Sequence, residues 1–112
     1  SLTLLAIYPV YTIVMVSYDI VLHPSAEDEY QSLKPERQGQ LKSVLQDVAA
    51  TRAPSEHSKI RHMEGQPGLL RLRVGDTRAI IELSQPQLRV LKIGNRDTVY
   101  QDIDTVVDKR LA

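Results

Sequence analysis

Arginine side chains recur at short, regular intervals in the second half of the chain. Arg71 and Arg73 are two positions apart, and Arg78 follows them after the Gly75-Asp76 pair. In a strand, residues two apart share a face and lie about 6.8 Å apart, comparable to successive phosphates of a single nucleic-acid strand. The planar guanidinium donates two parallel hydrogen bonds to phosphate. The spacing therefore indicates a phosphate-binding or acidic-partner surface; the alternative is a solvated sheet face, which is common.

These arginines belong to a local basic region in a chain that is neutral overall. The 112 residues include 14 Lys and Arg and 14 Asp and Glu. From position 59 to 96, eight basic residues stand against three acidic ones. The zero net charge removes the general basic character of many nucleic-acid-binding domains, but a local patch remains. The basic residues of this region are Lys59, Arg61, Arg71, Arg73, Arg78, Arg89, Lys92 and Arg96.

Other site chemistries find less support in the sequence. The chain has no Cys, which excludes disulfides, thiolate metal sites and thiol nucleophiles. His57 and His62 lie five residues apart in a predicted loop, a spacing that does not indicate a metal site. His23 precedes Pro24 and fits a turn. We therefore expect neither a metal ion nor a cofactor.

The first half of the chain predicts one strand and a helical hairpin. Residues 16–22 (VSYDIVL) include β-branched side chains and a Tyr and end before His23 and Pro24, as expected of a short strand. Pro24 fits a first helical turn, and the acidic residues after it favour a helix up to Lys34. Pro35 starts a second helix through about Arg52, whose apolar residues recur at helical spacing.

The second half predicts three strands and a last helix. Residues 51–67 are polar and predict a loop. The runs 69–74, 77–83 and 88–93 are joined by short turns, which predicts an antiparallel meander. Thr98 and Gln101 match a capping box that opens the last helix. Its apolar stripe comprises Val99, Ile103, Val106, Val107 and Leu111. The order β-α-α-β-β-β-α predicts one α+β domain, with helices packed on one face of a small antiparallel sheet.

The N-terminal segment differs from the remainder of the chain. Residues 1–16 carry no charge. Pro9 and the absence of flanking Lys or Arg argue against a membrane span, and no secretory cleavage pattern is visible. We expect residues 1–14 to be an addition before a natural start at Met15, with 15–112 forming the domain. The alternatives are an extra strand at a sheet edge and a membrane-associated segment.

Two motifs carry a resemblance to a known family. The stretch Leu70–Arg78 (LRLRVGDTR) and the stretch Lys92–Arg96 (KIGNR), followed by Val99 and Tyr100, resemble the RelE/ParE toxin superfamily. The resemblance runs from Tyr18 to Leu111. It implies a RelE-like fold and an antitoxin partner whose helix wraps and blocks the toxin. It also implies a cytoplasmic protein of a type II toxin–antitoxin module, whose complex binds operator DNA through the antitoxin.

The resemblance to RelE-like members implies a metal-independent endoribonuclease that cleaves mRNA in the ribosomal A site. The implied mechanism is attack of a ribose 2′-OH on the adjacent phosphodiester. The implied catalytic residues are Arg73, Arg78, Arg96 and Tyr100. Phosphate or RNA binding is expected of Arg71, Lys59, Arg61 and Lys92.

The sequence departs from the family pattern at three positions. Arg73 stands where Lys is frequent, Thr77 where Tyr is usual, and Asn95 where many members have His. Because an arginine is effectively never deprotonated, Arg73 is a poor general base, and we expect it to act electrostatically. The alternatives are a ParE-like inhibitor of DNA gyrase without ribonuclease activity and an inactive antitoxin-binding module.

Overall fold

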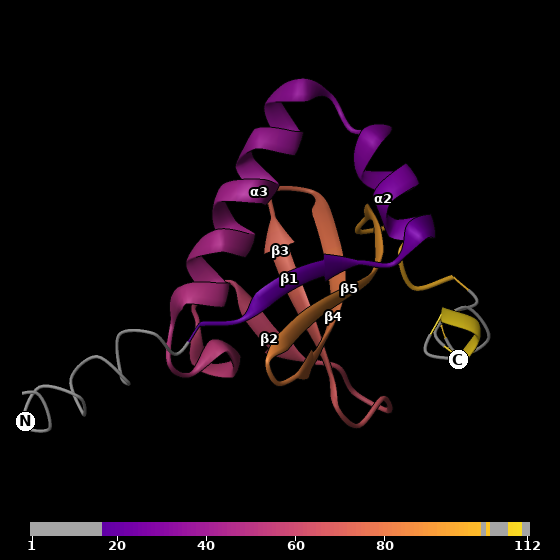
Figure 1. Ribbon diagram of the computed structural model, residues 1–112. Coiled ribbons are helices and arrows are strands. Elements are labelled where there is room, and N and C mark those ends of the chain that lie inside the picture. Colours follow the sequence, from indigo (N-terminus) through magenta and orange to yellow (C-terminus); the bar gives the residue numbers. More distant parts are fainter. Residues whose placement is uncertain (1–16, 102, 104–107, 111–112) are drawn as a thin grey trace, which may run out of the picture.

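The computed structural model describes residues 17–101, 103 and 108–110. A five-stranded sheet in the order β1-β5-β4-β3-β2 forms its centre. Two helices cover one face of this sheet (Figure 1). The strands are β1 (Asp19–Leu22), β2 (Ile60–His62), β3 (Leu69–Val74), β4 (Thr77–Ser84) and β5 (Gln87–Asn95), and the helices are α2 (Pro24–Gln31), α3 (Pro35–Ala50) and the 3-10 helix η1 (Pro54–Glu56).

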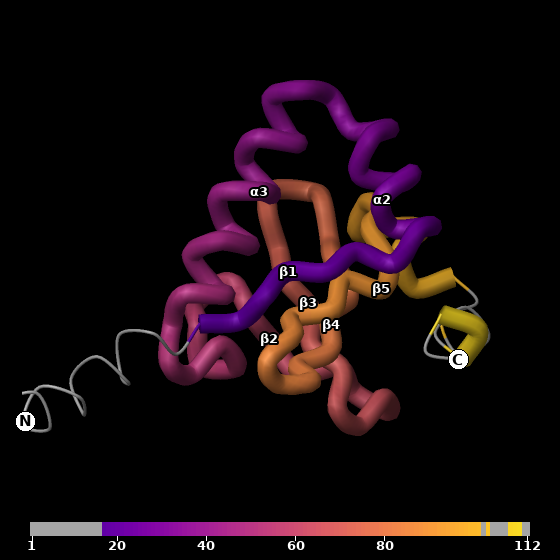
Figure 2. Tube along the Cα trace, viewed as in Figure 1, coloured from indigo at the N-terminus to yellow at the C-terminus, as the bar shows by residue number. Residues whose placement is uncertain are grey.

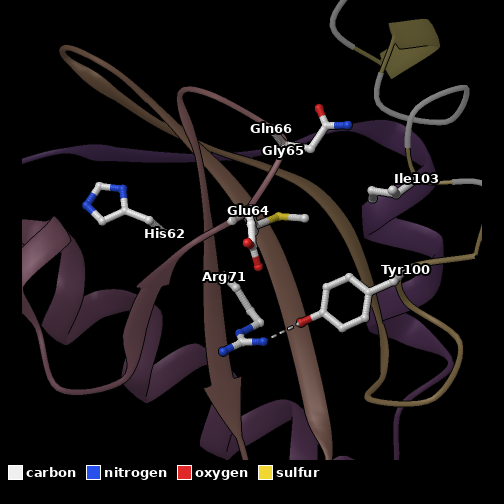
Figure 3. A pocket seen from close by; sticks show the side chains of 8 residues that line it. His62, Glu64, Gly65, Gln66, Arg71, Tyr100 and Ile103 are labelled. Carbon is white, nitrogen blue, oxygen red and sulfur yellow. Dashed lines mark hydrogen bonds between the residues drawn. The ribbon is translucent and has the colours of Figure 1, made fainter.

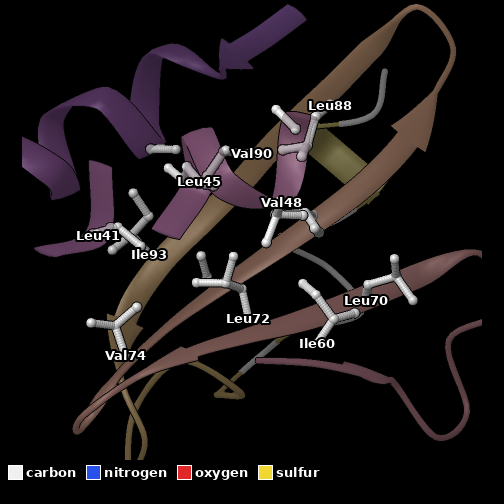
Figure 4. Close-up of a cluster of buried hydrophobic side chains, with 14 residues drawn as sticks. Leu41, Leu45, Val48, Ile60, Leu70, Leu72, Val74, Leu88, Val90 and Ile93 are labelled. Carbon is white, nitrogen blue, oxygen red and sulfur yellow. The ribbon is translucent and has the colours of Figure 1, made fainter. Parts of the chain in front are cut away.

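The main core lies between the helices and the sheet (Figure 4). Helix α3 contributes Leu41, Leu45 and Val48, which recur at the three- and four-residue spacing of one helical face. The sheet contributes alternate residues such as Leu70 and Leu72, since successive strand residues point to opposite faces. The apolar periodicity thus turns the intervening strand residues, Arg71 among them, away from the helices.

The predicted meander is confirmed: β3, β4 and β5 are paired antiparallel. Strand β1, however, runs parallel to β5, with Ile20 opposite Leu88. The sheet is therefore mixed, and the prediction of an antiparallel sheet is wrong for this strand pair. The helical hairpin carries the chain from β1 at one edge of the sheet to β2 at the other edge. Figure 2 shows β1 beside β5, followed by the rise of the chain into α2.

Two boundaries differ from the sequence prediction. The region 51–67, predicted as a loop, contains η1 and the short strand β2. Ile60, which is fully enclosed in the main core, anchors this strand opposite Leu72. The first helix ends at Gln31 rather than at Lys34. The Ser32 backbone N–H still bonds to the last carbonyls of α2, but no regular helix continues from there to Pro35.

A β-bulge in β5 shapes the opposite face of the sheet. Ile80 pairs with Lys92 and Ile81 pairs with Val90, so Leu91 has no partner on β4. Both Val90 and Ile93 face the main core, whereas Leu91 packs on the other side. There it joins a second buried cluster, comprising Leu69, Ile80, Leu91 and Val99, with Met63, Tyr100 and Ile103 at its margin.

The chain after β5 begins with a turn rather than with the predicted capping box. The Asn95 side-chain oxygen accepts hydrogen bonds from the Asp97 and Thr98 backbone N–H groups and from the Thr98 hydroxyl. Asn95, not Thr98, therefore caps this segment. Val99 is buried as predicted. The predictions for residues 1–14, Val106, Val107 and Leu111 lie outside the described residues. No helix in the described part is long and apolar enough to cross a membrane.

Candidate functional site

The basic strand residues lie on the sheet face opposite α2 and α3. Arg73 is directly opposite Arg78 across the β3–β4 hairpin, and Arg61 is directly opposite Arg71 across β2 and β3. Directly paired strand residues share a face. Like charges at paired positions repel one another, and an anion bound between them would relieve that repulsion. The predicted alternation thus brings four arginines onto one face.

Arg71 and Tyr100 form the central contact of this face. The Arg71 Nη1 donates a 3.3 Å hydrogen bond to the Tyr100 hydroxyl. Tyr100 is held in place by its neighbour Val99, whose side chain packs against Gly94 of β5; a Cβ on Gly94 would lie 3.4 Å from Val99. Arg71 and Tyr100 are 29 positions apart in the sequence. Both side chains are partly buried.

A cleft of about 610 Å³ opens beside this contact (Figure 3). Tyr100 and Arg71 line it, and the Glu64 carboxylate points toward Arg71 (Figure 3). Its apolar margin comes from Met63 and Ile103, which also pack on the second cluster. The lining residues are His62, Met63, Glu64, Gly65, Gln66, Arg71, Tyr100 and Ile103.

The loop that carries Glu64 consists of two successive turns. Gln66 N–H donates to the Met63 carbonyl, and Leu69 N–H donates to the Gln66 carbonyl. Gly65 occupies the third position of the first turn with φ of 77°. Positive φ at that position is typical of a type II turn, where glycine is favoured. The sequence Met-Glu-Gly-Gln thereby places Glu64 at the rim of the cleft.

On the other side of Arg71 lies a smaller groove of about 70 Å³ that is rich in cations. It is lined by Ser58, Lys59, Arg61, Arg71 and Arg73. The Arg61 Nη1 donates to the Ser58 and Ile60 carbonyls, at 3.2 and 2.8 Å. Arg71 lines both the groove and the larger cleft. Four of the predicted residues, Lys59, Arg61, Arg71 and Arg73, are thus brought together.

The groove is supported from outside by His57. Its Nδ1 accepts a 3.0 Å hydrogen bond from the Lys59 backbone N–H, and its Nε2 lies 2.6 Å from the Asp47 carboxylate. Since Nδ1 is an acceptor, Nε2 carries the proton and donates to Asp47. The Lys59 carbonyl in turn accepts from the Arg73 backbone N–H. His57 therefore positions the peptide from which Lys59 projects.

Arg78, in the second position of β4, and Arg96, directly after β5, lie close to the β3–β4 turn and line neither the cleft nor the groove. The Arg78 Nη1 donates to the Gly75 and Thr77 carbonyls, at 2.7 and 3.1 Å. Arg96 is exposed, with Nε 4.0 Å from Asp76 and 3.9 Å from Asp97. Surface ion pairs of this kind contribute little energy, so the Arg96 guanidinium is available to a ligand.

The two remaining basic residues of the region serve the scaffold in this structure. The Lys92 Nζ donates to the Gln101 carbonyl at 3.1 Å and braces the segment that carries Tyr100. Arg89 pairs with Glu82 across β4 and β5 at 3.0 Å. Among the described residues, no group of three or more His, Asp or Glu side chains is placed to hold a metal ion.

Sequence reasoning missed the acidic and apolar side of the site. Met63 and Glu64 line the cleft, but they lie in a segment that the sequence predicted as a loop. Ile103 lines it too, although the sequence predicted it only as part of the apolar stripe of the last helix. The signal that could have found Glu64 was the Gly65 turn directly before the arginine-bearing strand. It would have indicated a hairpin, and a hairpin brings its loop over the neighbouring strand face.

Comparison with known proteins gives structural matches only. No protein-family model matches the chain, and no curated protein matches its sequence. A double arginine-to-alanine mutant of the E. coli toxin RelE in the free state matches with a TM-score of 0.67 and 17% identity, covering 86% of this chain and 99% of that one. The chain has the fold of the RelE toxins.

Two archaeal complexes match the RelE-like fold of this chain at similar levels. The RelE–RelB complex from Pyrococcus horikoshii has a TM-score of 0.61 and 22% identity, covering 73% of this chain and 98% of that one. The RelB–RelE antitoxin–toxin complex from Methanococcus jannaschii has a TM-score of 0.62 and 13% identity, covering 73% and 96%. The predicted RelE-like α+β fold is therefore confirmed.

Proposed function

We propose that this protein is the toxin of a type II toxin–antitoxin module and acts as an endoribonuclease on mRNA in the ribosomal A site. One observation carries the proposal. Arg71, hydrogen-bonded to Tyr100, is shared by a cleft large enough for a nucleobase and a groove lined by four cations. Unpaired RNA is commonly recognised by stacking of its bases on aromatic rings and by contacts to its backbone. The RelE-like fold is consistent with this activity.

The proposed chemistry is an intramolecular transesterification. The ribose 2′-oxygen attacks the adjacent phosphorus, the bond from phosphorus to the 5′-oxygen breaks, and a 2′,3′-cyclic phosphate and a 5′-hydroxyl result. Arg71 and Arg78 hold the phosphate, and Arg73 stabilises the developing negative charge. Since Arg73 cannot serve as a base, water or a ribosomal group accepts the 2′-OH proton. Arg96 neutralises the charge that develops on the leaving 5′-oxygen, which takes its proton from water.

The proposal includes a protein partner. Several of the matching structures contain an antitoxin with the toxin, among them the intact E. coli RelBE toxin–antitoxin complex. By analogy, we propose that a cognate antitoxin blocks this chain in the cytoplasm, and that the complex binds operator DNA through the antitoxin. A short neighbouring gene for an acidic, helix-rich protein would support this assignment.

The test of the proposed function is induction of the protein in growing cells, followed by mapping of transcript 5′ ends. We expect growth arrest and new 5′ ends within translated regions. Arg78→Ala or Arg96→Ala should remove both effects. A DNA-damage response without transcript cleavage would favour a gyrase inhibitor instead. Antitoxin binding without any toxicity would favour an inactive binding module. Full toxicity of both variants would show that the assigned residues are wrong.

A further inference from the structure

Glu64 is an unpaired carboxylate within an otherwise cationic site. It lines the cleft with Arg71 and Tyr100, and its carboxylate points toward Arg71 (Figure 3). Within the described residues, Glu64 makes no hydrogen bond and no ion pair. A free carboxylate here repels an RNA backbone, so it weakens phosphate binding unless it faces a different part of the ligand. The nucleobase edge, which carries N–H donors, is that part.

We propose that the cleft is a subsite for a single unpaired guanine base, with Glu64 as the residue that selects it. This inference rests on the proposed function and deepens it. Tyr100 and the apolar Met63 and Ile103 margin provide a surface for the flat base. Arg71, at the border of the cation groove, holds the neighbouring phosphate. The base and its phosphate are thus bound on the two sides of one arginine.

The choice of guanine follows from the donors of each base edge. An ionised carboxylate only accepts hydrogen bonds and presents two oxygens. Guanine offers two adjacent donors on its Watson–Crick edge, N1–H and the N2 amino group, which match the two oxygens. Adenine and cytosine each offer one amino group beside a ring acceptor. Uracil offers one N–H between two carbonyls, which repel a carboxylate.

His62, which also lines the cleft, is less suited to bind the base edge. His62 is opposite Leu70 in the β2–β3 register, and Leu70 faces the main core. The His62 ring accordingly points away from Tyr100 (Figure 3). Glu64 is therefore the carboxylate that lines the cleft beside Arg71 and Tyr100.

Binding of uncleavable RNA tests the subsite without any need for catalysis. The full chain is titrated with 2′-O-methyl trinucleotides UGU, UAU, UCU and UUU, and affinities are taken from NMR shifts of backbone amides around Arg71 and Tyr100. A good bidentate contact discriminates by about 5- to 150-fold. We expect UGU to bind at least about 5-fold more tightly than the others, and Glu64→Gln to bind all four within about two-fold.

The matched control is Glu27→Gln, an exposed acidic residue in the first turn of α2, on the helical side of the molecule. It should keep the wild-type preference. Equal affinity of the wild type for all four trinucleotides, no binding of any, or a preference that survives in Glu64→Gln would each overturn the subsite. If UGU is preferred but induced cells keep intact transcripts, the proposed cleavage fails and the subsite stands. If transcripts are cut and binding shows no preference, the reverse holds.

Discussion

The Arg37 guanidinium of α3 lies directly against Gly75, the residue that turns the chain from β3 into β4. The Arg37 Nη1 donates a 2.7 Å hydrogen bond to the Val74 carbonyl. Gly75 has φ of 59°, and a Cβ there would collide with the Arg37 guanidinium. The turn between Arg73 and Arg78 is therefore fixed from the helical side, and this fixes the spacing of the two arginines on the other face.

Gly75→Ala should destabilise the protein by about 1–2 kcal/mol, the cost of placing a side chain at left-handed φ. In an Arg37→Ala background the collision is absent, so Gly75→Ala should lower the stability less there than in the wild-type background. Urea denaturation of the four proteins measures the coupling. Gly39→Ala is the control: nothing lies within 4 Å of a Cβ there, and stability should rise by about 0.4–1 kcal/mol. Equal stability of Gly75→Ala and wild type would contradict the proposed role of the turn.

Two substitutions at Tyr100 separate stacking from the hydrogen bond to Arg71. Tyr100→Phe removes the 3.3 Å bond but keeps the ring, and should weaken RNA binding about 2- to 10-fold. Tyr100→Ala also removes the stacking surface and should weaken binding about 5- to 150-fold. Binding of the uncleavable trinucleotides measures both. If Tyr100→Phe is as damaging as Tyr100→Ala, then the hydroxyl rather than the ring is the important group.

Arg110 connects the C-terminal part of the chain to the bulged strand. Its Nη1 donates to the Leu91 carbonyl at 2.8 Å and to Glu29 of α2 at 3.0 Å, while the same Glu29 oxygen accepts the Ile93 N–H. Arg110→Ala leaves the Glu29 carboxylate, which is 28% exposed, without its cation. We expect a loss of about 1–3 kcal/mol in the free energy of unfolding. The exposed Lys109 is the control, and Lys109→Ala should be neutral; equal losses in both variants would contradict the role of the ion pair.

The strands and helices were predictable because each is encoded locally. Apolar residues alternate in 69–74 and recur at helical spacing in 35–52, and both patterns fixed which faces are buried. The parallel pairing of β1 with β5 was not encoded in this way, since it depends on contacts between residues about 68 positions apart, such as Ile20 and Leu88. The short strand β2 was missed because only Ile60 among its three residues is buried.

The site was predictable in its residue types and only partly in its geometry. Alternation placed Arg71 and Arg73 on one face, but it could not show that the Arg78 side chain bonds to the carbonyls of its own turn. Nor could it place Glu64, since the loop conformation depends on φ at Gly65. Asn95 stands at a position where the resemblance to the RelE/ParE superfamily leads us to expect His. The Asn95 side chain caps the following turn, which gives this departure a structural reason.

Salt dependence gives a quantitative test of the cation groove. The chain is neutral overall, so long-range steering is weak, and the four cations of the groove should dominate RNA binding. Each phosphate contact to a single strand contributes about 0.7 to the slope of log K against log salt concentration. We therefore expect a slope of about −3 for a single-stranded oligonucleotide, and a reduction by about 0.7 in Arg61→Ala. Fluorescence anisotropy at several salt concentrations measures it.

The weak steering also predicts that cleavage depends on the ribosome to deliver the RNA. Free mRNA should be cut much more slowly than the same mRNA bound to a ribosome with an open A site.

The control for the salt series is Lys42→Ala, because Lys42 is exposed on α3 and lines a hollow with Ile20 and Leu45, on the helical side of the sheet. Its removal should leave the slope unchanged, although it alters the net charge by the same amount as Arg61→Ala. Equal reductions of the salt slope in Arg61→Ala and Lys42→Ala would mean that net charge, not the groove, attracts the RNA. For the ribosome prediction, efficient cutting of free RNA would contradict the dependence on the ribosome.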